Sequence, residues 1–171
     1  NDATVAAIDI GTNSTKLLVT GSGRRHFEVV DTRLGEGLGT AGRFAPAAIE
    51  RTLDALDRFR RTAESLGATR LAAVATSATR DAADGASFLT AATSVLGTRP
   101  VLLSGADEGR LGASAALAGL PSTNGRRLVL DIGGGSTEFV LHDGATIEGV
   151  CSIDVGCVRL TEAELRGDPP R

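Results

Sequence analysis

A repeated octapeptide constrains the fold of this chain more than any other feature. Residues 9–16 read D-I-G-T-N-S-T-K and residues 131–138 read D-I-G-G-G-S-T-E, so five of eight positions are identical. Aliphatic, strand-like runs flank both copies: residues 5–8 and 17–19 around the first, 128–130 and 139–141 around the second. The repeat predicts two β-hairpins with glycine turns, one in each of two related lobes.

Both turns suit an anion, because glycines let backbone N–H groups approach a ligand closely. We therefore predict phosphate binding by eight turn residues: Gly11, Thr12, Asn13, Ser14, Gly133, Gly134, Gly135 and Ser136. Asp131 enters the second turn and Glu138 leaves it, which makes sense if a divalent cation or an attacking water lies between these carboxylates and the anion. An ordinary glycine hairpin is the alternative, and the repeat argues against it.

Hydrophobic periodicity places the other elements. The clearest is a helix from Pro46 to about Leu66, whose apolar residues recur at steps of three and four and which Gly67 ends. We expect further helices at 84–96, 107–117 and from about 158. The expected strands are 4–10, 15–20, 26–33, 70–75, 100–103 and 146–155, and residues 34–43 are expected to form a loop.

Composition excludes several classes of protein. The net charge of −3 over 171 residues gives no general basic footprint for nucleic acid. No apolar run approaches the roughly 20 residues of a membrane span, and the start of the sequence shows no signal-peptide pattern, so we expect a cytoplasmic protein. Cys151 and Cys157 lack the partners of a zinc site, and we expect them to be buried free thiols.

Four further segments carry a family resemblance: R-L-G-E-G-L at 33–38, A-T-S-A-T-R-D-A at 75–82, S-G-A-D-E at 104–108 and G-C-V-R-L-T-E at 156–162. With the two hairpins, they resemble the Ppx/GppA family of exopolyphosphatases and guanosine pentaphosphate phosphohydrolases, within the actin, hexokinase and Hsp70-type ATPase superfamily. The resemblance implies an α/β fold: a ribonuclease H-like (actin-like ATPase) lobe with a mixed sheet and flanking helices, plus the start of a second similar lobe.

The expected domain division follows from this resemblance and from a turn-rich linker. Residues 1–122 form a complete first lobe with the first hairpin, and residues 123–171 begin a second lobe with the second hairpin. A matching second lobe would need on the order of a hundred more residues. We therefore expect the chain to be the N-terminal portion of a longer enzyme.

The resemblance also implies roles for individual residues. The implied catalytic residues are Glu108, Arg80, Asp131 and Glu138. Glu108 is selected over its neighbour Asp107 because it occupies the glutamate position of the S-G-x-x-E motif. Asp131, Asp9 and Glu138 are the expected ligands of Mg²⁺ or Mn²⁺, since such ions bind few protein carboxylates and retain water. Lys16 receives no role because its strand register is not determined by the sequence.

Three functions compete at this stage. The first is release of orthophosphate from inorganic polyphosphate, and the second is hydrolysis of guanosine pentaphosphate to the tetraphosphate. The third is a regulatory module that binds phosphate or nucleotide without turnover. The absence of Trp and Tyr, with only five Phe to stack on a guanine, favours polyphosphate over the nucleotide. The expected partners exclude nucleic acid and membranes, and a homodimer is left open.

Overall fold

A computed structural model describes residues 3–21, 23–121 and 125–165. The chain divides into two compact units, unit 1 (Asn1–Leu102) and unit 2 (Leu103–Arg171). The division lies earlier than the expected boundary at 122/123, which falls among residues outside the described part. The difference arises because helix α5 (Gly105–Ala118) packs on the strands of unit 2.

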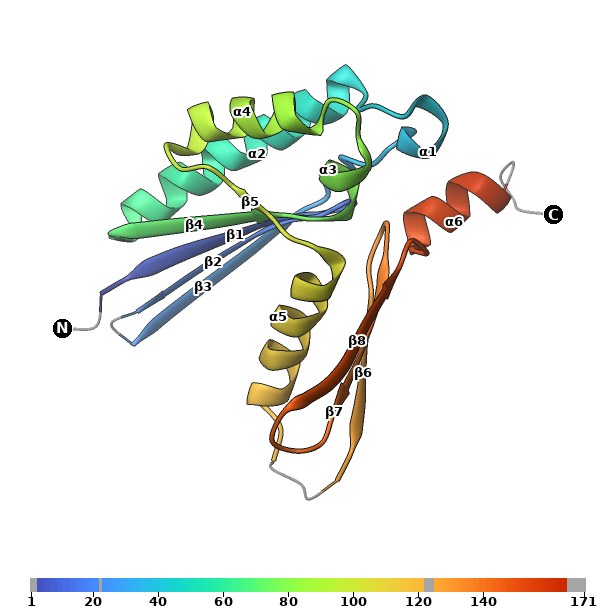
Figure 1. Ribbon diagram of the computed structural model, residues 1–171. Helices are drawn as coiled ribbons and strands as arrows, with labels where there is room; N and C mark the ends of the chain where they lie inside the picture. Colours follow the sequence, from blue (N-terminus) through green and yellow to red (C-terminus); the bar gives the residue numbers. More distant parts are fainter. Residues whose placement is uncertain (1–2, 22, 122–124, 166–171) are drawn as a thin grey trace. The chain divides into compact units, whose positions relative to one another are not determined.

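Unit 1 contains a mixed five-stranded sheet with the order β3-β2-β1-β4-β5 (Figure 1). Strand β1 pairs antiparallel with β2 and parallel with β4, so the first hairpin occupies the centre of the sheet. Side chains alternate between the two faces of a strand, and in β1 Ala6, Ile8 and Ile10 point into the core. The strands are β1 (Val5–Ile10), β2 (Thr15–Gly21), β3 (Arg24–Val30), β4 (Arg70–Ala75) and β5 (Val101–Leu102).

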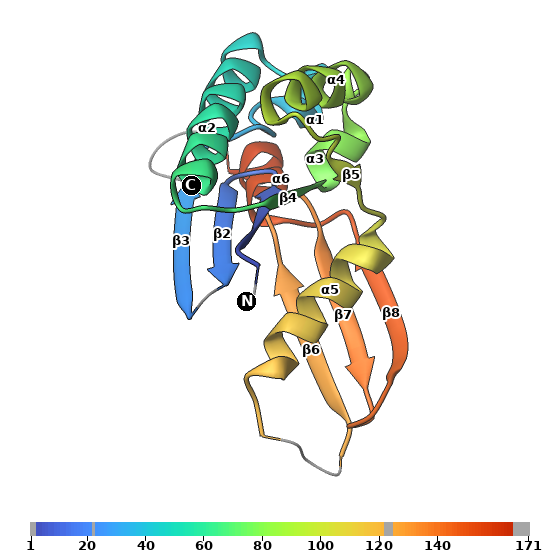
Figure 2. The ribbon, with the colours of Figure 1, turned by 90° about the vertical axis from the view of Figure 1, so that its left-hand side faces the viewer.

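Two long helices, α2 (Pro46–Ser65) and α4 (Gly85–Leu96), lie on one face of this sheet (Figure 2). The buried face of α2 includes Leu56 and Phe59, at the helical spacing that the sequence predicts. Phe88 of α4 packs edge-on against Phe44 with ring centroids 5.4 Å apart. The expected helices at 46–66 and 84–96 are therefore confirmed, and together with β1 and β2 they build one apolar core.

Two short helices correct the sequence prediction. Helix α1 (Leu38–Ala41) lies within the expected loop at 34–43, between Gly37 and Gly42, whose φ angles are 70° and 66°. Helix α3 (Ser77–Asp81) lies within the motif that follows β4. Helices of four and five residues complete little more than one turn, so the recurrence of apolar residues cannot reveal them.

Unit 2 contains a three-stranded antiparallel sheet, β6-β7-β8, with α5 packed on one face. A Cβ atom at Gly109 of α5 would lie 3.2 Å from side-chain atoms of both Val140 and Val150, so a larger residue there would require these side chains to shift by a few tenths of an ångström. The strands are β6 (Arg127–Ile132), β7 (Thr137–His142) and β8 (Ile147–Ile153), followed by helix α6 (Cys157–Glu164).

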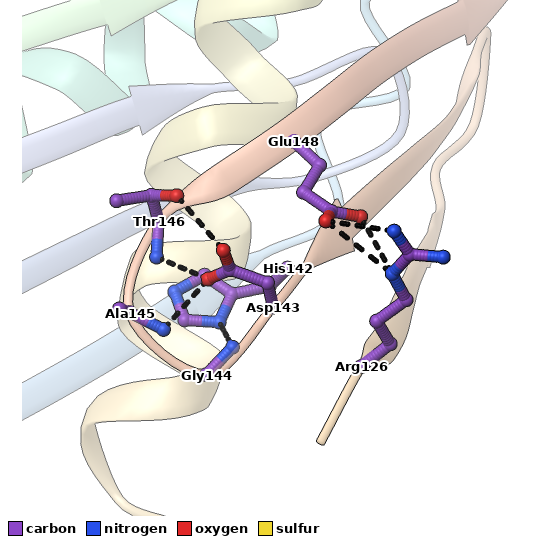
Figure 3. A network of polar contacts seen from close by, with 7 residues as sticks. All are labelled: Arg126, His142, Asp143, Gly144, Ala145, Thr146 and Glu148. Atoms are coloured by element: carbon purple, nitrogen blue, oxygen red, sulfur yellow. Dashed lines mark hydrogen bonds and ion pairs between the residues drawn. The ribbon is translucent and has the colours of Figure 1, made fainter. Parts of the chain in front are cut away.

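The β7–β8 turn is closed by its own side chains (Figure 3). Asp143 Oδ1 accepts hydrogen bonds from the N–H groups of Ala145 and Thr146 at 2.8 and 2.7 Å, an arrangement typical of aspartate in turns. These bonds, that from Thr146 first, lower the pKa of the Asp143 carboxyl. An ion pair of 3.0 Å joins Arg126, just before β6, to Glu148 on β8 and ties the two outer strands together at this end.

The face of β6–β8 that points away from α5 carries exposed apolar side chains. Leu130 and Ile132 are 50% and 68% exposed, whereas Ile8 and Ile10, which occupy the same positions of the repeat in unit 1, are 1% exposed. Cys151 lies opposite Phe139 on this outer face, and both cysteines are exposed. The prediction of buried thiols is therefore wrong, because nothing in the described part of the chain covers them.

A search of the described helices for a segment long and apolar enough to cross a membrane finds none.

Phe59→Ala tests the core of unit 1. Phe59 is fully buried, so we expect the free energy of unfolding to fall by about 3–5 kcal/mol in denaturant titrations. Phe27→Ala, at a side chain that is 57% exposed on β3, is the matched control and should cost no more than about 0.5 kcal/mol. Equal losses in the two variants would contradict the core described here.

Candidate phosphate-binding site

The two glycine turns close in the same way. In hairpin 1 (β1–β2) the Gly11 N–H donates to the Ser14 carbonyl at 3.1 Å, and in hairpin 2 (β6–β7) the Gly133 N–H donates to the Ser136 carbonyl at 2.9 Å. A Cβ at either glycine would lie about 3 Å from that carbonyl oxygen (2.9 Å at Gly11, 3.1 Å at Gly133). The repeat in sequence is therefore a repeat in structure. The N–H groups of Gly11 and Gly133 close the two turns.

In hairpin 2 the glycine carbonyls are bound on one side by the start of α6. Cys157 N–H donates to the Gly133 carbonyl at 3.0 Å, and Val158 N–H donates to the Gly134 carbonyl at 2.9 Å. Arg159 Nε donates to the Gly135 carbonyl at 3.0 Å. Gly156 permits this contact, since a Cβ there would lie 2.4 Å from the Gly134 carbonyl.

This arrangement orients the N–H groups of hairpin 2. In a planar trans peptide, the N–H of each residue points opposite to the preceding carbonyl. The N–H groups of Gly134, Gly135 and Ser136 therefore point away from α6. Within residues 125–165 none of the three takes part in a hydrogen bond. Successive backbone N–H groups directed to one side form a concave anion-binding nest.

Hairpin 1 achieves the same orientation with a different segment. The Gly35 N–H donates to the Thr12 carbonyl at 2.9 Å, and the Arg33 N–H donates to the Asn13 carbonyl at 2.7 Å. The N–H groups of Asn13 and Ser14 consequently point to the opposite side. Arg33 reaches this position with a φ of 49°, the only positive φ among the described residues other than glycine. Such a conformation is strained and persists only where the surroundings impose it.

Two carboxylates flank hairpin 2 on the face that α5 covers. Asp131 and Glu138 are directly opposite each other in the β6–β7 register. Glu138 is 1% exposed, and its Oε1 accepts a hydrogen bond of 2.7 Å from the Ser152 hydroxyl on β8. Asp131 is exposed, and its Oδ2 would lie 3.0 Å from a Cβ at Gly112 of α5. The predicted second hairpin therefore brings the two carboxylates onto neighbouring strands.

The first turn of α5 separates the roles of its two acidic residues. Ser104 Oγ donates to Asp107 Oδ2 at 2.7 Å and accepts from the Asp107 N–H at 3.1 Å, and Arg110 pairs with the same carboxylate at 3.0 Å. The hydrogen bond from Ser104, then that from Arg110, lowers the pKa of the Asp107 carboxyl, which makes it a weaker base. Ser104 thus caps the helix, and the Asp107 carboxylate is held by Ser104 and Arg110. Glu108 is half-buried next to Gly109, where an added Cβ would lie 3.3 Å from Glu138 Cβ.

The remaining predicted residues belong to unit 1. Arg80 is half-buried in α3, which follows the carboxyl end of β4. Asp9 lies opposite Lys16 in the β1–β2 register, and its Oδ2 is 3.3 Å from Lys16 Nζ. Unit 2 thus contains Glu108, Asp131 and Glu138 on packed elements, while Arg80 and Asp9 come from the other unit.

The carboxylates of unit 2 fit a magnesium ion that retains most of its water. No group of three or more His, Cys, Asp or Glu suited to a metal occurs among residues 3–21, 23–121 and 125–165. Mg²⁺ commonly needs only one or two protein carboxylates beside substrate phosphates. Asp131 is the better ligand of the pair, because it is exposed whereas Glu138 already accepts from Ser152.

Three residues that contact the site received no role from the sequence: Arg33, Ser152 and Arg159. Arg33 and Arg159 belong to the R-L-G-E-G-L and G-C-V-R-L-T-E segments, so a motif marked their neighbourhood but not their function. Ser152 gave no signal, because its contact with Glu138 depends on the register of two strands.

Known proteins share this sequence and fold. The profile of the Ppx/GppA phosphatase family matches residues 23–171. Exopolyphosphatase 2 of Mycobacterium tuberculosis is 41% identical over 180 residues, covering 97% of this chain and 56% of that protein. The chain therefore spans about half the length of the curated relatives that it matches.

Solved structures agree with the sequence comparison. The crystal structure of an exopolyphosphatase-like protein superposes with a TM-score of 0.89 at 35% identity, over 99% of this chain and 56% of that one. The crystal structure of the Ppx/GppA family member of Aquifex aeolicus superposes with a TM-score of 0.79 at 32% identity. This match covers 100% of this chain and 57% of that one. The expected actin-like ATPase fold is confirmed. With the family profile matching most of its residues, the chain belongs to the Ppx/GppA phosphatase family.

Proposed function

We propose that the protein hydrolyses the terminal phosphoanhydride bond of inorganic polyphosphate and releases orthophosphate. The observation that carries this proposal is hairpin 2, where three neighbouring N–H groups point to one side and two carboxylates lie at the strand ends. The name of the 41% identical relative, exopolyphosphatase 2, supports the choice of substrate.

The N–H groups of Gly134, Gly135 and Ser136 bind the oxygens of the terminal phosphoryl group. Each hydrogen bond to a charged group is worth about 1.5–3 kcal/mol, so a few of them suffice to hold and polarise the phosphoryl. Asn13 and Ser14 present a separate set of outward N–H donors on hairpin 1 of unit 1. The net charge of the chain is −3, so attraction for a polyanion has to come from such local groups.

Glu108 orients the attacking water and accepts its proton. The water oxygen forms a bond to the terminal phosphorus, and the bond between that phosphorus and the bridging oxygen breaks. Orthophosphate leaves, and the shortened polyphosphate keeps the bridging oxygen. Arg80 offsets the negative charge that develops on the phosphoryl oxygens. Because Ser104 and Arg110 hold the Asp107 carboxylate, Glu108 is the acidic residue of this turn that we assign as the base.

Asp131 is the proposed principal carboxylate ligand of Mg²⁺ or Mn²⁺, with Glu138 beside it. When bound there, the ion neutralises charge on the phosphate oxygens as a Lewis acid. Ser152 fixes the carboxylate of Glu138 through its hydroxyl. Asp9 is a weaker candidate ligand, because Lys16 competes for its carboxylate.

Measuring orthophosphate release from two candidate substrates side by side tests which of them the protein hydrolyses. We expect orthophosphate to be released faster from long-chain polyphosphate than from guanosine pentaphosphate, measured on the purified protein with Mg²⁺. The reverse preference would instead identify a guanosine pentaphosphate phosphohydrolase. Binding of both compounds without any release would identify a phosphate-binding module and refute the enzyme proposal.

Glu108→Gln tests the base. We expect the turnover number to fall about 10²- to 10⁴-fold, the usual contribution of a general base, while the dissociation constant for polyphosphate changes little. Asp107→Asn is the matched control on the adjacent residue. It should leave turnover within about threefold, because an exposed substitution changes free energies by only about 0.5 kcal/mol. Near-normal turnover by Glu108→Gln would refute the assignment.

Removal of divalent cations tests the metal. Excess chelator should lower phosphate release by about 100-fold or more, since Lewis-acid stabilisation is worth several kcal/mol. Added Mg²⁺ should restore it, and unchanged circular dichroism would show that the fold survives. Asp131→Asn should raise the Mg²⁺ concentration needed for half-maximal rate. Full activity in chelator would rule out the metal.

A further inference from the structure

We propose that Arg159 is a positioning residue for phosphate binding by hairpin 2. Its guanidinium holds the Gly135 carbonyl so that the N–H of Ser136 points at the phosphoryl group. The inference rests on the proposed function only in taking phosphate as the ligand of this hairpin. It assigns a role to a residue that neither touches the substrate nor takes part in proton transfer.

The contacts of Arg159 are made to two successive peptides of the turn. Its backbone N–H donates to the Gly134 carbonyl at 3.1 Å, and its side-chain Nε donates to the Gly135 carbonyl at 3.0 Å. The side chain is half-buried, which limits competition from water for these carbonyls. One residue therefore fixes the two peptides whose N–H groups belong to Gly135 and Ser136.

The position of Arg159 in its helix is unfavourable for a positively charged side chain. It is the third residue of α6, and the positive end of the helix dipole disfavours cations in the first turn. An arginine there opposes the local preference. The hydrogen bond to the Gly135 carbonyl offsets this cost, because the carbonyl carries the partial negative charge that the guanidinium needs.

A donor at this carbonyl strengthens the nest as well as orienting it. A hydrogen bond to the C=O of a peptide polarises that peptide, so the N–H on its other side becomes a better donor. Here the affected N–H is that of Ser136.

Hairpin 1 provides a contrast within the same chain. The carbonyls of Thr12 and Asn13 are bound by the backbone N–H groups of Gly35 and Arg33. The guanidinium of Arg51 in the same unit donates instead to the Thr32 carbonyl and the Glu36 carboxylate. A substitution of Arg159 should therefore alter the amides of hairpin 2 and leave those of hairpin 1 unchanged.

Two substitutions separate orientation from charge. Arg159→Gln keeps an N–H donor on the atom that follows Cδ, where arginine has Nε, and removes the charge. Arg159→Met keeps an unbranched side chain and removes the donor. Arg126→Met is the control, since Arg126 pairs with Glu148 beside the β7–β8 turn and not with hairpin 2 (Figure 3). Calorimetry with inorganic tripolyphosphate and amide NMR spectra of the unliganded proteins are the two measurements.

We expect Arg159→Met to weaken tripolyphosphate binding about 10-fold or more, and to shift the amide resonances of Gly135 and Ser136 but not those of Asn13 and Ser14. Arg159→Gln should stay within about threefold of the wild type and Arg126→Met should match it. Wild-type affinity in Arg159→Met, or an equal loss in both Arg159 variants, would overturn the positioning role.

Results that refute the proposed hydrolase activity differ from results that refute the role of Arg159. A protein that binds tripolyphosphate but never hydrolyses polyphosphate refutes the enzyme and still tests Arg159 through affinity. A protein that binds no tripolyphosphate refutes phosphate as the ligand. In that case the amide NMR spectra test the positioning role. If the Arg159 side chain orients the turn, the amide resonance of Ser136 shifts in Arg159→Met and not in Arg159→Gln.

Discussion

Hydrogen bonds to the backbone carbonyls of two glycine turns are the interaction on which the candidate site depends. A peptide unit is rigid, so binding its carbonyl on one side directs the following N–H to the other. In unit 2 the start of α6 binds the carbonyls of Gly133, Gly134 and Gly135. In unit 1 the segment after β3 does so for Thr12 and Asn13. In each unit the outward direction of the N–H groups is thus set by a neighbouring segment that binds the carbonyls from the other side.

Close approach of backbones is the second requirement, and it explains several glycines outside the turns. Gly156 lets α6 reach the Gly134 peptide, and Gly35 lets its segment reach Thr12, whose Cγ2 would lie 2.4 Å from a Cβ there. Gly109 brings α5, and with it Glu108, onto the sheet face that carries Asp131 and Glu138. Packing and chemistry are therefore coupled in unit 2, because a larger residue at Gly109 would move the proposed base away from the carboxylates.

Much of the fold and part of the site were predictable from local pattern. The repeat placed both hairpins, and helical spacing placed α2, because strand and helix periods leave regular marks on a sequence. The sequence placed Asp131 and Glu138 at the two ends of the second turn, and the strand register of the structure puts them opposite each other. The short helices α1 and α3 leave no such mark. The roles of Ser152 and Arg159 could not be predicted, because their hydrogen-bond partners lie 14 and 24 residues away in the sequence.

The sequence by itself determined the family, the two glycine turns and the residue types at their ends, since these depend on short segments whose chemistry is local. Only the tertiary structure decided which N–H groups are directed outward, that Gly11 and Gly133 close the turns, and that the Asp107 carboxylate is held by Ser104 and Arg110. It also grouped α5 with the second unit and left Cys151 exposed. These outcomes depend on which segments pack together, and a one-dimensional pattern does not record contacts between segments that are far apart in the chain.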